Sequence, residues 1–140
     1  LLARTGWTGR GLDLRRGDGR PGKGRERARE LLKQKKRPTA VFCYNDMTAL
    51  GVLEEAAARG LESGRDLSVV GFDDLFFAAL LKPGLTTIRQ PMRELGQRAM
   101  ALLLALLRGE EAERTAVIRG ELVVRGSTQK IAVAVPQKDK

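Results

Sequence analysis

Five polar side chains stand where apolar runs of the sequence end, and their chemistry suits the binding of a small polar ligand. They are Asn45, Asp46, Asp73, Asp74 and Gln90. Amides and carboxylates together supply donors and acceptors, and each hydroxyl of a polyhydroxylated ligand needs both. Two carboxylates also suggest acid–base catalysis. Neighbours in an extended segment point to opposite sides, however, so Asp73 and Asp74 make a poor catalytic pair and we expect no enzyme.

Each of these residues also has an ordinary structural explanation. Asn45 or Asp46 can cap a helix, Asp74 can form a turn, and Gln90 can be a surface amide. Only their joint position at the ends of strands favours a binding site. Ligands of open α/β sheets bind beyond the carboxyl ends of the strands, which is where all of these side chains are expected.

The composition excludes several kinds of functional site. The 140 residues contain no His and one Cys, which excludes His-based catalytic triads, internal disulfides and the usual zinc sites. Cys43 lies within an apolar run and is expected to be a buried small side chain. The glycines near residues 9–19 lack the preceding strand of a phosphate-binding loop. We therefore expect neither a metal nor a cofactor.

The net charge of +9 is confined to the first quarter of the chain. Residues 1–37 hold 13 basic and 4 acidic side chains, whereas the remainder is neutral. This pattern indicates either a solvated leader followed by a basic helix face or a fragment that binds nucleic acid. The segment has few aromatic side chains on which bases could stack. The longest apolar run, Ala99–Leu107, is too short to cross a membrane.

The elements that would position the polar side chains alternate along the chain. The spacing predicts a helix over Arg25–Lys36, a strand over Ala40–Tyr44 that is buried on both faces, a helix over Met47–Arg59 and a strand over Leu67–Phe72. A strand, helix and strand within this length form a βαβ unit with parallel strands. The fold class is therefore α/β with a parallel sheet.

The second half of the chain continues this pattern. A third strand is predicted over Leu85–Arg89, and a helix over Met92–Arg108 is apolar nearly all round, which predicts burial on more than one side. Alternation between Ala116 and Val124 predicts another strand. Ile131–Val135 is a candidate last strand, and residues 136–140 form a tail.

Four segments carry a resemblance to a known family. RPTAVFCYNDMTALG at 37–51, DLSVVGFDD at 66–74, PGLTTIRQP at 83–91 and ELVVRGST at 121–128 resemble, in order and spacing, the C-terminal half of LacI/GalR-family transcriptional regulators. The resemblance implies a periplasmic-binding-protein-like fold of which this chain is a partial, two-lobed version. It implies that an effector, a sugar or nucleobase, contacts Asn45 and Asp73, with Gln90 contributing. It also places Met47, Leu50, Leu80 and Leu81 near a homodimer interface.

The resemblance further suggests how the chain is divided. Residues 25–90 correspond to the C-terminal lobe, 91–114 to a crossover helix of the N-terminal lobe, and 115–135 to strands that return to the C-terminal lobe. Residues 1–24 match weakly and are expected to be a disordered leader. DNA would be contacted only through an N-terminal domain missing from this sequence, in a cytoplasmic regulator. The alternatives are a periplasmic-type solute-binding protein for sugar uptake and the nucleic-acid-binding fragment.

Overall fold

The computed structural model describes residues 13–111 and 115–130. Within those residues the chain forms three α-helices, a short 3-10 helix and four short strands. In chain order they are α1 (Pro21–Leu32), β1 (Ala40–Phe42), α2 (Asp46–Ala58), β2 (Ser68–Val70), η2 (Phe76–Ala79), β3 (Thr87–Arg89), α3 (Met92–Leu107) and β4 (Glu121–Val123). The predicted strand Ile131–Val135 and the tail 136–140 lie outside the described residues.

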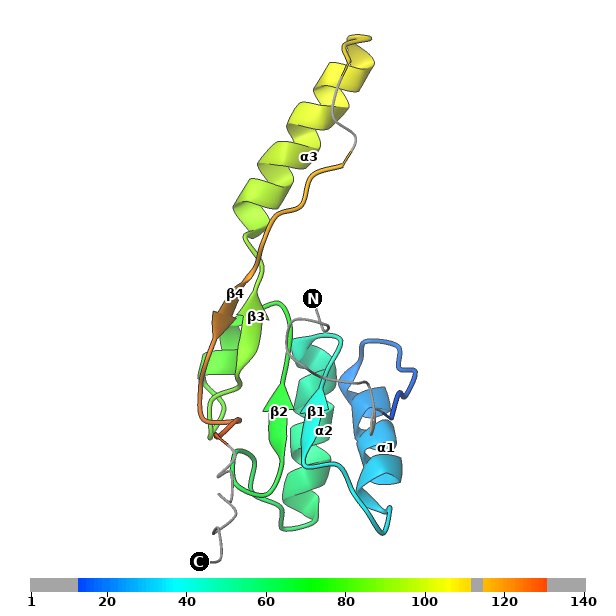
Figure 1. The fold of residues 1–140 in the computed structure, drawn as a ribbon, viewed down its shortest axis with the longest axis vertical. Coiled ribbons are helices and arrows are strands. Elements are labelled where there is room, and N and C mark those ends of the chain that lie inside the picture. Colours follow the sequence, from blue (N-terminus) through cyan, green and yellow to red (C-terminus); the bar gives the residue numbers. More distant parts are fainter. Residues whose placement is uncertain (1–12, 112–114, 131–140) are drawn as a thin grey trace, which may run out of the picture.

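The strands lie side by side in the order β1-β2-β3-β4. β1 pairs with β2 in parallel, which confirms the predicted βαβ unit, and β3 pairs with β4 in antiparallel. Parallel bridges from Val70 to Thr86 and from Asp73 to Arg89 join the two pairs. The carboxyl ends of β1, β2 and β3 therefore share one edge of the sheet, and α3 projects from that edge (Figure 1).

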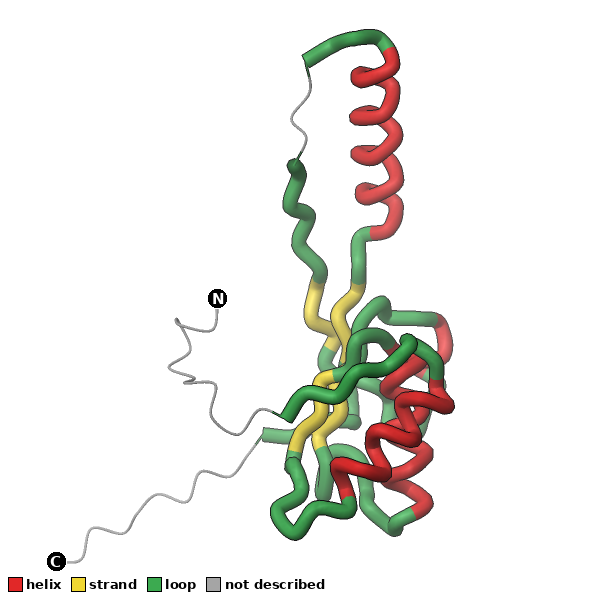
Figure 2. The backbone as a smooth tube through the Cα atoms, turned by 90° about the vertical axis from the view of Figure 1, so that its right-hand side faces the viewer, coloured by secondary structure: helices red, strands yellow, loops and turns green. Residues whose placement is uncertain are grey.

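Helices α1 and α2 lie on the same side of the strands, and the core lies between them and the sheet (Figure 2). Its buried members are Ala28, Leu32, Cys43, Ala49, Val52, Ala56, Leu67, Val69, Ala78 and Leu85. The prediction that the first strand is buried on both faces is wrong. Phe42 is 67% exposed and Tyr44 is 79% exposed, because in the described part of the chain no helix covers their side of β1.

The first helix begins four residues earlier than predicted and ends four residues earlier. Pro21 occupies the start of α1, where its fixed φ suits a helix and its missing N–H costs nothing. Gly24 then lies so close to α2 that a Cβ would collide with the backbone of Thr48. Beyond Leu32, residues 33–36 are exposed and offer no apolar side chain to bury, so the helix ends.

Helix α3 has nearly the predicted bounds but not the predicted burial. It extends away from the sheet, and none of its residues is buried (Figure 1). The expectation that its apolar surface is buried on more than one side is therefore wrong within the described structure, since a projecting helix has few neighbours. The strand predicted from Ala116 to Val124 forms ladder pairs only as β4. No helix in the described residues is long and apolar enough to span a membrane.

Candidate ligand-binding site

Asn45 stands between the end of β1 and the start of α2. Its Oδ1 accepts a hydrogen bond from the backbone N–H of Thr48 at 2.8 Å, so Asn45, and not Asp46, caps α2. Its Nδ2 donates to the backbone carbonyl of Gly19 at 3.1 Å. The amide therefore ties the segment before α1 to the edge of the sheet.

Asp73 and Gln90 meet at the same edge. The Gln90 Nε2 donates to Asp73 Oδ1 at 2.6 Å, and the Asp73 N–H donates to the carbonyl of Ile88 at 2.8 Å. Asp73 and Asp74 have φ angles of 112° and 57°, so the prediction of an extended segment here is wrong. Non-glycine residues adopt such angles uncommonly, Asp more readily than most, and residues with such angles cluster at functional sites.

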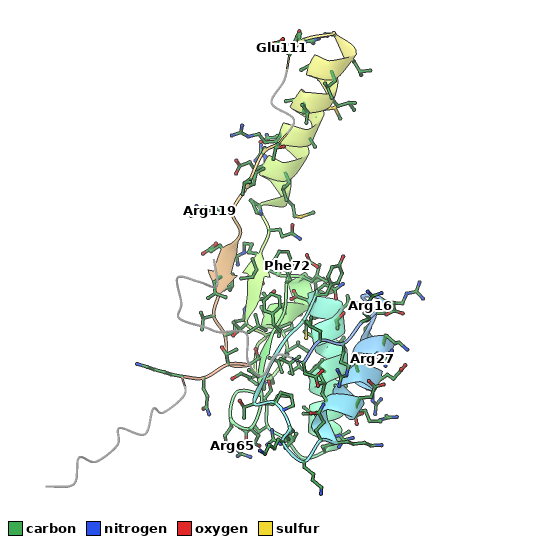
Figure 3. All side chains as sticks on the ribbon, turned by 45° about the vertical axis from the view of Figure 1, so that its right-hand side comes forward. Arg16, Arg27, Arg65, Phe72, Glu111 and Arg119 are labelled. Atoms are coloured by element: carbon green, nitrogen blue, oxygen red, sulfur yellow. The ribbon has the colours of Figure 1, made fainter. Side chains whose placement is uncertain are left out.

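The three predicted residues lie in one row. The backbone N–H of Asp46 donates to the carbonyl of Phe72 at 2.8 Å, which joins the end of β1 to the end of β2. Asn45 is thus beside the segment that carries Asp73, and Asp73 contacts Gln90. Figure 3 shows Phe72 at the end of the sheet from which α3 projects. The structure therefore gathers all three side chains along the carboxyl-terminal edge.

Asp46 lies buried beneath this edge and connects the segments that form it, a role that the sequence did not reveal. Its side chain is fully buried, its Oδ1 accepts from the Thr87 hydroxyl at 2.6 Å, and its Oδ2 accepts from the N–H of Leu75 at 2.7 Å. A Cβ on Gly71 would collide with this carboxylate. An Asp at the start of a helix is common, so no local signal marks this one as buried.

Asp74 is held by two arginines. Its Oδ1 pairs with Arg125 Nη2 at 2.7 Å and its Oδ2 with Arg89 Nε at 2.7 Å. Burial alone would raise the pKa of Asp74, but the hydrogen bonds from Arg125 and then Arg89 outweigh it and lower the pKa. Arg125 lies directly after the predicted strand Ala116–Val124, and an ion pair with so distant a residue leaves no signal in the sequence.

The site offers hydrogen bonding and little else. It presents a carboxylate and two amides, which suit hydroxyl and amino groups of a ligand. Cys43 is 3% exposed, which confirms its predicted burial, and burial followed by the charge of Asp46 raises the pKa of its thiol to about 12. That thiol stays protonated and is a poor nucleophile. Residues 13–111 and 115–130 contain no group of His, Cys, Asp and Glu that could hold a metal ion.

A cavity of about 700 Å³ lies beside this row rather than around it. It runs along β1, between α1 and the segment 13–19, and reaches Gly19, Tyr44 and Thr48 next to Asn45. None of Asn45, Asp73 and Gln90 lines it. The row itself is an open edge that faces the projecting α3.

The four residues predicted near a dimer interface differ in how much of each side chain is exposed to solvent. Leu80 is 70% exposed and Met47 is 36% exposed, whereas Leu50 is half-buried. Leu81 packs partly against the core. Leu80 and Met47 therefore offer most of the accessible apolar surface of this set.

Comparisons with known proteins agree on one family. The model of the periplasmic binding protein-like domain matches residues 6–128. The HTH-type transcriptional repressor CytR of Escherichia coli K12 is 40% identical over 117 residues, which are 83% of this chain and 34% of that protein. The repressor PurR of Vibrio campbellii is 40% identical over 105 residues, which are 74% of this chain and 31% of that protein.

Solved structures give the same result. The Lac repressor dimer bound to operator and the anti-inducer ONPF superimposes with a TM-score of 0.83 and 33% identity, over 92% of this chain and 44% of that chain. A LacI-family regulator of Arthrobacter sp. FB24 in complex with lactose gives a TM-score of 0.69 and 30% identity, over 79% and 42%. The chain spans about one third of the curated relatives. By sequence and by fold, it belongs to the LacI family of transcriptional regulators and forms part of their periplasmic-binding-protein-like domain.

Proposed function

We propose that this chain is the effector-sensing part of a transcriptional regulator, and that Asn45, Asp73 and Gln90 contact the effector. The observation that carries the proposal is the hydrogen bond from Gln90 to Asp73 beside a backbone with positive φ. It presents a carboxylate and an amide together at the edge where ligands of α/β sheets bind. The effector class is a sugar or nucleobase, whose hydroxyl or amino groups match these donors and acceptors.

The remaining partners follow from the same proposal. The regulator acts as a homodimer through the face of Met47, Leu50, Leu80 and Leu81, and it contacts DNA through a domain outside this chain. Its place is then the cytoplasm, where the operator DNA is. CytR and PurR are named repressors rather than uptake proteins, which favours this function over the solute-binding alternative.

The test uses the whole regulator that carries this segment, with substitutions that change the side-chain shape little. Asn45→Asp keeps the oxygen that caps α2 and removes the amide donor, and Asp73→Asn keeps the side-chain shape and tolerates positive φ. Asn45→Asp gives up the hydrogen bond to the Gly19 carbonyl, so the thermal unfolding of each variant is measured beside its effector affinity. Glu54→Gln, on the exposed side of α2, is the control. The probes are a panel of mono- and disaccharides and ribonucleosides, assayed by calorimetry and by release of operator DNA.

We expect one class of probe to bind, and both variants to weaken it by about tenfold or more. A polar group of the ligand left without its partner costs about 1–3 kcal/mol, and about 1.4 kcal/mol is tenfold. DNA binding without effector should match that of Glu54→Gln. Unchanged effector affinity in both variants would remove these residues from the site. Ligand binding with no effect on DNA would favour the solute-binding alternative.

A further inference from the structure

We propose that Arg125 is a positioning residue for the ligand-binding edge: it holds Asp74, and Asp74 keeps the turn that directs Asp73 towards Gln90. The consequence for effector binding rests on the proposed function, whereas the geometry itself involves no ligand. Arg125 follows β4, far along the chain from the residues that it organises.

Arg125 is held at three points. Its backbone N–H donates to the Thr86 hydroxyl at 2.9 Å, and its Nη1 donates to the carbonyl of Leu85 at 2.8 Å. Its Nη2 pairs with Asp74 Oδ1 at 2.7 Å, and the side chain is only 18% exposed. A guanidinium bound at both ends of its fork has one available orientation, so it sets the place of the Asp74 carboxylate.

Asp74 in turn depends on its arginines. Its side chain is 8% exposed, and its second oxygen is paired with Arg89. A nearly buried carboxylate that loses one of two cations is left without full compensation for its lost hydration. We therefore expect Asp74 to move towards water when Arg125 is removed, and to carry its own backbone with it.

The backbone of Asp73 and Asp74 makes this movement consequential. Both residues have positive φ, a conformation that non-glycine residues keep only where their surroundings hold it. Asp73 is held by its N–H bond to Ile88. Asp74 is held by its ion pairs and by a longer N–H bond to the Thr87 hydroxyl at 3.4 Å, so the ion pairs are its shorter contacts. Release of Asp74 relaxes the turn and withdraws Asp73 Oδ1 from the Gln90 amide.

Asp74 is also linked to β4 through its other arginine, Arg89. Arg89 Nη1 donates to Glu121 Oε2 at 3.3 Å, and Arg125 lies two residues beyond the end of β4. Glu121 is much more exposed than Asp74, so its contribution to holding Arg89 is the smaller. Of these two ion pairs, the one between Arg125 and Asp74 is therefore the one that is shielded from water.

The test is nuclear magnetic resonance of the ligand-free 140-residue chain carrying Arg125→Gln. In the unaltered chain the side-chain amide of Gln90 should resonate apart from exposed glutamines, because it donates to a carboxylate. In Arg125→Gln we expect this signal to move to the exposed range and the backbone amide of Asp73 to exchange at least about tenfold faster. The amide of Val52, in the core of α2, should exchange as before.

Three further variants make the outcome specific. Arg125→Lys keeps the charge without the fork and should restore part of both signals. Asp74→Asn should reproduce Arg125→Gln, and the double variant should be no worse than either single one. Arg65→Gln breaks exposed pairs with Glu62 and Asp66 at the opposite end of the molecule and should change neither signal (Figure 3).

Unchanged Gln90 and Asp73 signals in folded Arg125→Gln would overturn the proposal. Faster exchange at Val52 as well, or loss of folding in both Arg125→Gln and Asp74→Asn, would equally overturn it, because Arg125 would then support the whole fold and not the turn. Failure of the proposed function is distinct, since it appears as unchanged effector affinity in Asp73→Asn and leaves these ligand-free signals as they are.

Discussion

At the scale of single residues, Asp46 shows how a buried charge can order a surface that it does not reach. Its carboxylate is held by one hydroxyl and one backbone N–H, and it joins α2 to the segment after β2 and to β3. Each bond counts because a buried polar group without a partner keeps its full cost of lost hydration. Asn45 and Asp73 lie directly beside the segments that Asp46 connects.

Replacing Thr87 by Val tests this role. The hydroxyl at 2.6 Å from Asp46 disappears while the shape of the side chain is kept. A hydrogen bond to a charged group contributes about 1.5–3 kcal/mol, so we expect the free energy of unfolding to fall by that amount. Thr39→Val, at an exposed position, should stay within about 0.5 kcal/mol of the unaltered chain. Urea denaturation measures both, and equal midpoints would contradict the role of Asp46.

At the scale of elements, α1 and α2 pack through glycines. A Cβ on Gly24 would meet the Thr48 backbone, and a Cβ on Gly51 would meet the carbonyl of Pro21. Gly22, which lies in α1 like Gly24, has nothing within 4 Å of such a Cβ. Glycine on its own destabilises a helix, but Gly24 and Gly51 allow α1 and α2 to approach each other closely.

Alanine at two positions of α1 should therefore have opposite effects. Gly22→Ala should stabilise the chain by about 0.4–1 kcal/mol, because it lowers the entropy of the unfolded state. Gly24→Ala should destabilise it by about 1–3 kcal/mol, since the added methyl forces the helices apart. Thermal unfolding of the pair decides the matter. A stabilising Gly24→Ala would show that α1 does not lie against α2 as described.

The same two helices are joined by a buried carboxylate. Glu55 of α2 is 4% exposed and contacts Arg59 at 3.0 Å, Arg29 at 3.3 Å and Arg25 at 3.4 Å. Its pKa is lowered to about 2, first by the hydrogen bond from Arg29, against burial, and then by those from Arg59 and Arg25. A pKa below that of the unfolded chain stabilises the fold at higher pH.

The pH dependence of stability should follow from Glu55. Its contribution is fully present above the ordinary glutamate pKa of 4.5 and is lost as the pH falls from there towards the lowered pKa of about 2. The difference in unfolding free energy between the unaltered chain and Glu55→Gln should thus be largest at neutral pH and shrink in this window. Glu54→Gln, at the neighbouring exposed position, is the matched control. A difference that stays constant from pH 7 to pH 2.5 would refute the assignment.

At the scale of the whole molecule, the described residues expose large apolar side chains along α3 and near η2. Leu103 is 49% exposed and Leu107 is 74% exposed on α3, and Leu80 adds a second apolar position near η2. Contiguous apolar surface of this kind usually marks a contact with another protein or another part of the same one.

We expect the 140-residue chain to associate with itself through α3. Sedimentation velocity over a range of concentrations should show the mean mass rising with concentration. The double variant Leu103→Lys with Leu107→Lys should suppress the rise, whereas Gln97→Lys, which adds charge at a polar position of the same helix, should not. Leu80→Lys reports separately on the proposed dimer face. A monomer at every concentration would contradict both contacts.

Sequence pattern alone predicts the alternation of strands and helices and the edge of the sheet on which the candidate ligand-binding residues lie. Apolar runs that end in polar residues mark strand ends, and parallel neighbours bring those ends together. Five candidate side chains could be named for this reason, and the resemblance to LacI/GalR-family regulators then selects Asn45, Asp73 and Gln90 among them. The burial of Cys43 could likewise be predicted, from the apolar run that contains it. These features depend on local pattern and on one topological rule, both of which can be read along the chain.

The three-dimensional packing of the chain determines which charged side chains are buried and which faces of the strands are exposed. The pairing of Arg125 with Asp74, the burial of Asp46 and the positive φ of Asp73 depend on residues far apart in the chain, and side-chain periodicity carries no information about them. The glycine-rich residues at the start of α1 favour a loop by local propensity. They form a helix because Gly24 allows α1 to pack closely against Thr48 of α2. Phe42 and Tyr44 are exposed because burial depends on which elements cover a strand, and no strand's own residues specify that.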